Sequence, residues 1–260
     1  MHRTIRRISE KNRRKPIELP VTLCALFQKE DKTMDSKIHS WMEQYTGALR
    51  DTFGSRLWFV GLQGSYARGE ATAQSDIDAV VILDRVSPED LAAYSAMLDR
   101  LPDRDKVCGF ISGKDELFSW EPSDLFQFLY DTTPVLGSLE LLRERVSRED
   151  IRRAVWTGLC NAYHLCAHNM VHEKDPEILQ GLYKSAAFTL QAICYLQTGV
   201  YEKTREKLAA RLHPDDRKIL EWGRESRERP LSPEKFQSLS GNLLVWAREG
   251  LSHFSKERGC

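Results

Sequence analysis

The chain has 260 residues, 41% of them hydrophobic, and 38 Lys and Arg residues balance 38 Asp and Glu residues. This length suits one large domain or two of ordinary size, with enough apolar residues for a packed core. The balanced charge removes any bulk electrostatic reason to expect a nucleic-acid partner, and no apolar run approaches the roughly 20 residues that cross a bilayer. The six cysteines form no CxxC pair or regular framework, so reduced thiols and a cytoplasmic protein are expected.

The N-terminal segment is locally basic. Its first 16 residues contain seven Lys or Arg and a single Glu. A basic arm on nucleic acid or on a membrane is one interpretation. Because a clean amphipathic helix pattern starts just after Met34, we favour a disordered extension over residues 1–33.

Helix and strand patterns alternate between residues 36 and 112. An amphipathic helix is predicted over 36–53, and the short apolar runs 56–62, 76–83 and 106–112 predict buried strands. Between the second and third strands, the segment 87–90 (Ser-Pro-Glu-Asp) predicts a capped helix start. This alternation is typical of an α+β sheet layer.

The strand patterns stop at Ser147. Ser147 and Asp150 resemble a capping box, and five helical patterns with short connections follow, the second of them ended by Gly199. The sequence therefore predicts two domains: an α+β domain over 34–145 and an all-α helical bundle over 146–260.

Asp76 and Asp78 come at the start of the second predicted strand. Side chains two apart on a strand share a face, so these carboxylates would converge, with their Cα atoms roughly 7 Å apart. Such a pair is costly unless a cation neutralises it, and Mg²⁺ takes carboxylate oxygens while keeping waters and substrate phosphates as its other ligands. The spacing predicts a Mg²⁺ site.

Gly64 and Ser65 directly follow the first predicted strand. The residues after them can start a helix, whose exposed N–H groups would face an anion. A phosphate cradle beside a two-aspartate metal site provides the parts needed for phosphoryl or nucleotidyl transfer.

The same residues resemble a known signature. Gly64-Ser65, Arg68 and the Asp76-x-Asp78 pair before an apolar strand are similar to the Gly-Ser…Asp-x-Asp signature of the DNA polymerase beta-like nucleotidyltransferase superfamily. The resemblance implies an α+β fold: a polymerase beta-like domain, with a mixed sheet and helices, followed here by the helical bundle. It also implies that the domain over 34–145 is catalytic, that the helical domain over 146–260 binds the substrate, and that the active-site cleft lies between them.

Within that superfamily the chain looks most like the aminoglycoside nucleotidyltransferases, especially the streptomycin and spectinomycin adenylyltransferases. The resemblance continues through the strand pattern 106–112, Trp120 and the helix pattern 123–131. In the helical half, Lys184 matches a lysine that reaches the nucleotide triphosphate in related enzymes. A solvated surface charge is the alternative for Lys184.

The resemblance implies a Mg²⁺-dependent adenylyltransferase that moves a nucleoside monophosphate, AMP from ATP, to a hydroxyl of a small acceptor such as an aminoglycoside. Asp76 and Asp78 would be catalytic and hold the metal. Gly64 and Ser65 would bind phosphate oxygens, and Arg68 would add charge there or brace the loop. Two rivals remain open: a protein-modifying minimal nucleotidyltransferase of antitoxin type, and a catalytically degenerate nucleotide-binding interaction module.

This sequence differs from the family pattern at the third carboxylate. Related enzymes place an acid on the strand equivalent to 106–112, whereas this strand has none and carries Cys108 near the expected position. Asp105 just before the strand, and Asp115 and Glu116 just after it, are the candidates to replace that acid. Asp105 is our first choice.

Two further features have competing interpretations. His164, His168 and His172 recur every four residues on a predicted helix, and a zinc site is not expected because the outer two are too far apart to share an ion. We favour a polar substrate pocket over packing within the bundle. The charge runs 202–211 and 224–229 are interpreted as coats on exposed helix faces.

Overall fold

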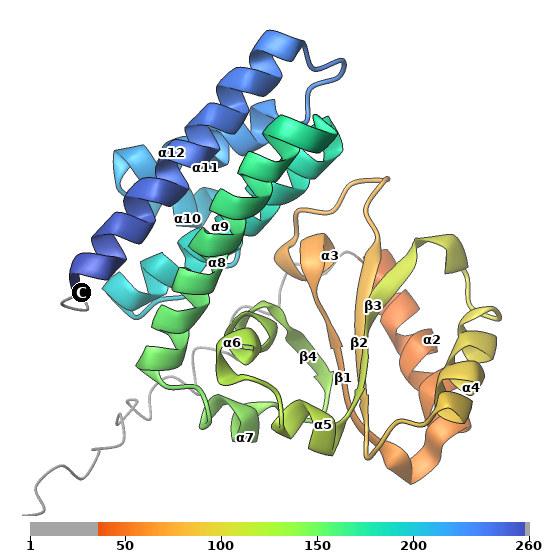
Figure 1. Cartoon of the computed structure of the whole chain (residues 1–260). Coiled ribbons are helices and arrows are strands. Elements are labelled where there is room, and N and C mark those ends of the chain that lie inside the picture. The colour runs from red at the N-terminus through yellow and green to blue at the C-terminus, as the bar shows by residue number, and fades with distance from the viewer. Residues whose placement is uncertain (1–35, 258–260) are drawn as a thin grey trace, which may run out of the picture. The chain divides into compact units, whose positions relative to one another are not determined.

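The computed structural model describes residues 36–257, which belong to a single compact unit. Figure 1 shows a sheet region in the N-terminal half of this part and long helices in the C-terminal half. The expectation of disorder over residues 1–33 lies outside the described residues. Between residues 36 and 257, no helix combines the length and apolar content needed to cross a membrane.

The sheet has four strands in the order β3-β2-β1-β4. The central pair, β1 (Leu57–Leu62) and β2 (Ile77–Leu83), is antiparallel, with Val60 opposite Val81. β3 (Val107–Gly113) runs parallel to β2, and β4 (Thr133–Leu136) runs antiparallel to β1. The mixed sheet expected from the sequence is confirmed.

β4 is an addition to the predicted strands. It has only four residues, and one of them is Pro134, which cannot donate to a strand ladder. It lies at the edge of the sheet, where a proline is tolerated. A run this short with a proline has no strand signal of its own.

Helices cover both faces of the sheet (Figure 1). They are α2 (Ser36–Phe53), α3 (Gly64–Arg68), α4 (Pro88–Leu98), α5 (Lys114–Phe118), α6 (Pro122–Asp131) and α7 (Glu140–Arg143). On one face, Phe59, Val80 and Ile82 share a buried core with leucines of α5, α6 and α7. Residues of the strands alternate in direction, so the intervening apolar side chains face α2 and α4.

The helical half starts at the predicted capping box. The backbone N–H of Ser147 donates to the Asp150 carboxylate (2.7 Å), and the backbone N–H of Asp150 donates back to the Ser147 hydroxyl (3.3 Å). The helices are α8 (Arg148–His168), continued by a π-helical turn (Asn169–Glu173), α9 (Pro176–Thr198), α10 (Arg205–Arg211), α11 (Pro214–Glu225) and α12 (Pro233–Glu257).

The core continues across the predicted domain boundary at residue 145. Phe126 of α6 is 2% exposed and shares a hydrophobic cluster with Ile151, Val155 and Leu159 of α8. The Tyr130 hydroxyl also lies 2.8 Å from the Tyr195 hydroxyl of α9. The division of the chain into two domains at residues 145 and 146 therefore stays a prediction.

Candidate active site

Asp78 is the second residue of β2, and Asp76 lies just before that strand. Asp78 is half-buried and Asp76 is exposed. Burial raises the pKa of Asp78, and repulsion from Asp76 raises it further, while Lys184 lowers it. The two carboxylates therefore lie near enough to repel each other in a partly desolvated place, which is the situation that a bound cation relieves.

The Gly-Ser turn packs directly on Asp78. The backbone N–H of Gln63 donates to the Asp78 carbonyl (2.8 Å), and α3 begins at the next residue, Gly64. Gly64 has a φ of +70°, and a Cβ on it would lie 1.7 Å from Asp78 Oδ2. A glycine is required here both for the backbone conformation and for the approach of the carboxylate. The first N–H groups of α3 therefore start beside the acid pair.

Arg68, at the end of α3, is engaged by two acids. Its Nε donates to Glu70 Oε2 (3.1 Å), and its Nη1 donates to Asp131 Oδ2 (3.0 Å). Asp131, the last residue of α6, is 6% exposed, so its charge needs this partner. The contacts favour the bracing role for Arg68, and a role in phosphate binding stays a prediction.

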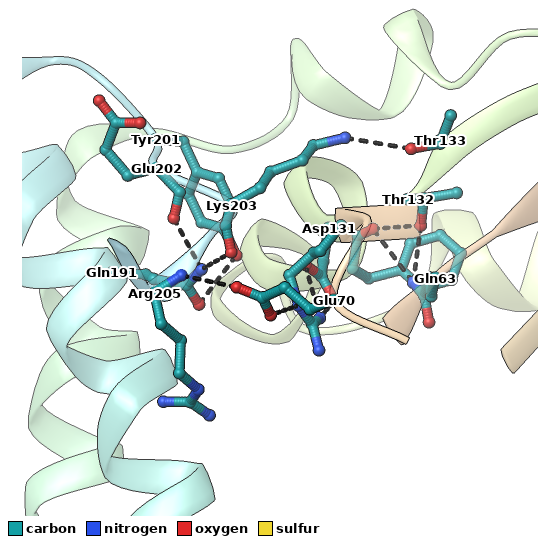
Figure 2. Close-up of polar contacts among 12 residues, drawn as sticks. Gln63, Glu70, Asp131, Thr132, Thr133, Gln191, Tyr201, Glu202, Lys203 and Arg205 are labelled. Atoms are coloured by element: carbon teal, nitrogen blue, oxygen red, sulfur yellow. Dashed lines mark hydrogen bonds and ion pairs between the residues drawn. The ribbon is translucent and has the colours of Figure 1, made fainter. Parts of the chain in front are cut away.

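A polar network extends from this brace into the segment before α10 (Figure 2). Glu70 Oε1 accepts a hydrogen bond from the backbone N–H of Arg205 (2.9 Å), and Lys203 Nζ donates to the Thr133 hydroxyl (3.3 Å). Sequence analysis missed Glu70 and Asp131, because their partners lie far away in the chain. A local sequence pattern does not indicate such a pairing.

Lys184 is an exposed residue of α9. Its charge acts on Asp78, opposing the pKa increase that burial causes. Lys184 therefore lies within electrostatic range of Asp78. Its contact with a triphosphate stays a prediction.

The three candidates for a third carboxylate lie at different ends of β3. Asp105 is in the short 3-10 turn η2 (Arg104–Lys106) directly before β3, at the same end as Asp78, whose register partner on β3 is Cys108. Asp115 and Glu116 belong to α5, beyond the other end of a seven-residue strand. A strand of that length spans about 20 Å. Asp105 alone of the three lies at the correct end.

The histidine stripe does not line the hollow of the helical half. His164, His168 and His172 are all exposed, with successive ring centroids 6.5 Å and 4.7 Å apart. Among residues 36–257, no group of three His, Cys, Asp or Glu side chains is arranged to hold a metal ion. The preference for a substrate-pocket role was wrong, because the stripe faces solvent.

The interpretation of the charge runs as solvent-exposed coats was also wrong in part. Glu202 is only 8% exposed, and Arg205 is half-buried in the wall of a hollow of about 380 Å³. Arg224 and Arg227, from the second run, are exposed as expected, and they line the same hollow. Charged residues of α11 at helical spacing could have signalled a shared face, as 217, 221 and 224 fall on one side of a helix.

Comparison with known proteins agrees with this geometry. The family model of the nucleotidyltransferase domain matches residues 47–134, which run from α2 to β4 and include the whole acid and Gly-Ser region. The chain contains a nucleotidyltransferase domain. The predicted enzyme class is thereby confirmed at the level of this domain.

No curated protein sequence matches the chain. Among solved structures, the spectinomycin adenyltransferase AAD(9) from Enterococcus faecialis, solved with ATP and spectinomycin, is similar with a TM-score of 0.48 and 16% sequence identity. The match covers 79% of this chain and 98% of that chain.

Proposed function

We propose that this protein is a Mg²⁺-dependent nucleotidyltransferase that moves a nucleoside monophosphate, AMP from ATP, onto a hydroxyl of a small acceptor. The observation that carries the proposal is the packing of the Gly64 turn on the Asp78 carboxylate, with Asp76 and Lys184 in electrostatic range. A phosphate cradle, an acid pair and a cation thus meet at one end of β2.

The acid pair suits a hard divalent cation. Asp76 and Asp78 offer carboxylate oxygens only, and their mutual repulsion is relieved by a positive charge. Bound Mg²⁺ would neutralise charge on the triphosphate and lower the pKa of the acceptor hydroxyl. The half-buried position of Asp78 restricts its motion, so its oxygens stay aimed at the same place.

The neighbouring residues have separate roles in the proposal. Backbone N–H groups of Gly64 and Ser65 donate to phosphate oxygens, as helix starts do for anions. Lys184 adds positive charge near the leaving pyrophosphate. Asp105 accepts the proton of the attacking hydroxyl, because it is the candidate acid at the correct end of β3.

One observation favours a second candidate function. The β3 residue in register with Asp78 is Cys108, and a thiol is a poor substitute for a carboxylate with a hard cation. A nucleotide binder without turnover is consistent with that position. Such a protein would show ATP-dependent thermal stabilisation but no release of pyrophosphate.

The decisive experiment neutralises the acid pair. Asp76→Asn with Asp78→Asn should lower pyrophosphate release by roughly 10²–10³-fold or more, because charge stabilisation of the transferring group is lost. The matched control is Asp115→Asn, an exposed acid at the far end of β3, which should leave the rate unchanged. Melting curves should show all variants folded.

Persistent transfer in the double variant would refute the mechanism. A panel of small hydroxyl-bearing acceptors, aminoglycosides included, identifies the acceptor by pyrophosphate release. Transfer of labelled nucleotide onto a protein band would instead support the protein-modifying rival.

A further inference from the structure

The helical half contains a hollow of about 380 Å³, a volume in the range of small-molecule sites. Single faces of three helices form most of its wall. The lining residues recur at helical spacing: Gln180, Tyr183 and Lys184 from α9, Arg205 and Ala209 from α10, and Arg217, Leu220 and Arg224 from α11. The wall is therefore built from secondary structure rather than from loose loops.

Positive charge dominates this wall. Five of its residues are Lys or Arg, and only Glu206 and Glu221 are acids. Among the described residues, the side chains of Arg205, Arg224 and Arg227 make no ion pair with a carboxylate. Arg217 donates to two backbone carbonyls, from Nε to Ala209 (2.9 Å) and from Nη2 to Leu212 (3.5 Å). Arg104, in contrast, forms an ion pair with Asp99 (2.9 Å).

Among these cations, Arg205 is the one that is partly buried. Burial lowers the pKa of Arg205 and repulsion from Arg227 lowers it further, while the more distant carboxylates of Glu70 and Asp131 offset part of this decrease. Figure 2 shows its guanidinium directed away from the Glu70 carboxylate, to which only its backbone is hydrogen-bonded. A partly buried guanidinium held near other guanidinium groups is stabilised by an anion.

The chemistry of the wall defines the ligand. Guanidinium groups match phosphate oxygens with paired N–H donors, which makes arginine clusters phosphate sites. A net excess of cations in a concave place attracts polyanions and repels polycations. A polycationic aminoglycoside therefore does not fit this hollow.

We propose that the hollow lined by Lys184, Arg205, Arg217, Arg224 and Arg227 binds a phosphate-bearing polyanion. Two sources share this chemistry: the β- and γ-phosphates of the nucleotide, which rests on the proposed function, and a phosphorylated second ligand. Lys184 borders the hollow and also acts on Asp78, so the hollow adjoins the proposed site of transfer.

The test uses tripolyphosphate and the full chain, with EDTA present so that no divalent cation contributes. Calorimetry should show binding that weakens steeply with salt, as contacts between charged groups do. Arg224→Gln with Arg227→Gln should weaken it at least about tenfold, the size of one lost charge-assisted hydrogen bond. The control Arg100→Gln with Arg248→Gln removes two exposed charges outside the hollow and should stay within about twofold.

A competition experiment distinguishes the nucleotide phosphates from a phosphorylated second ligand. Adding a non-hydrolysable ATP analogue with Mg²⁺ should displace tripolyphosphate if the nucleotide tail occupies the hollow. Simultaneous binding of both would identify a separate phosphate-bearing ligand, which also supports the proposal. Absence of tripolyphosphate binding at low salt, or equal weakening in the two double variants, would overturn it.

The outcome is independent of the proposed transfer reaction. Asp76→Asn with Asp78→Asn should abolish transfer and keep tripolyphosphate binding. If the wild-type protein transfers nucleotide but binds no tripolyphosphate, the hollow has another role and the proposed function stands. If it binds tripolyphosphate but transfers nothing, the function fails and the anion site stands.

Discussion

Gly64 and Asp78 pack directly against each other in the candidate site. The absence of a side chain at residue 64 lets the carboxylate of Asp78 lie against the start of α3. This contact joins the phosphate cradle to the acid pair, so each part of the proposed chemistry depends on the other. The proposed function therefore depends on the absence of a Cβ atom at residue 64.

Gly64→Ala should lower both stability and transfer. Its left-handed φ costs an alanine about 1–2 kcal/mol, and the new methyl would collide with Asp78 Oδ2. Urea unfolding and pyrophosphate release measure the two effects. The control Gly47→Ala, in a helix with nothing within 4 Å, should instead stabilise the protein by about 1 kcal/mol. A Gly64 variant as active and stable as the wild-type protein would contradict the packing.

Cys108 and Cys166 should differ in reactivity. Cys166 is fully buried, its Sγ donates to the Ser240 carbonyl (3.2 Å), and burial raises the pKa of its thiol to about 11. Cys108 is exposed and in register with Asp78. Because the thiolate is the reactive form, iodoacetamide at pH 8 should label Cys108 and spare Cys166. Peptide mass spectrometry reports the sites.

Nucleotide binding should protect Cys108 from that labelling. A non-hydrolysable ATP analogue with Mg²⁺ held beside Asp78 would cover the neighbouring thiol and slow alkylation by about tenfold. Equal labelling rates with and without the analogue would place the nucleotide away from this end of β3.

The buried Cys166 thiol also makes the stability of the protein depend on pH. A raised pKa favours the neutral thiol, so its stabilising effect is complete below the pKa of the unfolded state and is lost as pH rises toward 11.

At the scale of elements, the brace around Arg68 fixes the short helix α3 to the end of α6. Arg68 contacts both Glu70 and Asp131, and Glu70 in turn accepts a hydrogen bond from the backbone N–H of Arg205, the first residue of α10. The loop between α3 and β2 is thus tied at its start, although most of its residues are exposed. The tie keeps the Gly-Ser turn in place without a large hydrophobic contact.

Arg68→Met should destabilise the protein by about 3 kcal/mol, because it leaves the buried Asp131 charge unpaired. Adding Asp131→Asn should recover part of that loss, since the uncompensated charge is then gone. Denaturant unfolding of the two single variants and the double variant measures the coupling. Additive losses would show that the pair acts as two independent surface charges. The matched control is Arg104→Met, whose partner Asp99 is well exposed.

The elements themselves could largely be predicted from the sequence. The strand patterns over 56–62, 76–83 and 106–112 correspond to β1, β2 and β3, because short apolar runs between turn residues carry their own signal. The capping box at Ser147 was also predictable, since its two partners are three residues apart. β4 could not be predicted, as its pairing with β1 depends on a neighbour far away in the chain.

At the scale of the whole molecule, residues 36–257 share one continuous structure. Phe126 of α6 packs its ring 5.2 Å from Tyr195 of α9 and 5.6 Å from Tyr201, measured between centroids. The sheet region and the long helices therefore share aromatic core residues. A fragment ending at 145 would expose that core to water.

Phe126→Ala should lower the free energy of unfolding by about 3–5 kcal/mol, the usual cost of removing a buried phenyl ring. Because the ring serves both halves, we expect one thermal transition that moves down by about 10 °C. Scanning calorimetry with circular dichroism measures it. The control Leu141→Ala removes a side chain that is 58% exposed and should move the transition little. Two separate transitions would show that the halves unfold independently.

The sequence alone determined the local elements and the acid and Gly-Ser signature, because alternation, helix caps and short motifs depend on residues a few positions apart. Only the tertiary structure decided that Arg68 is taken by Asp131, that the histidine stripe faces solvent, and that arginines of α10 and α11 meet around one hollow. The physical reason is that burial and charge pairing depend on distance in space, and residues far apart in sequence become neighbours only when the core has packed.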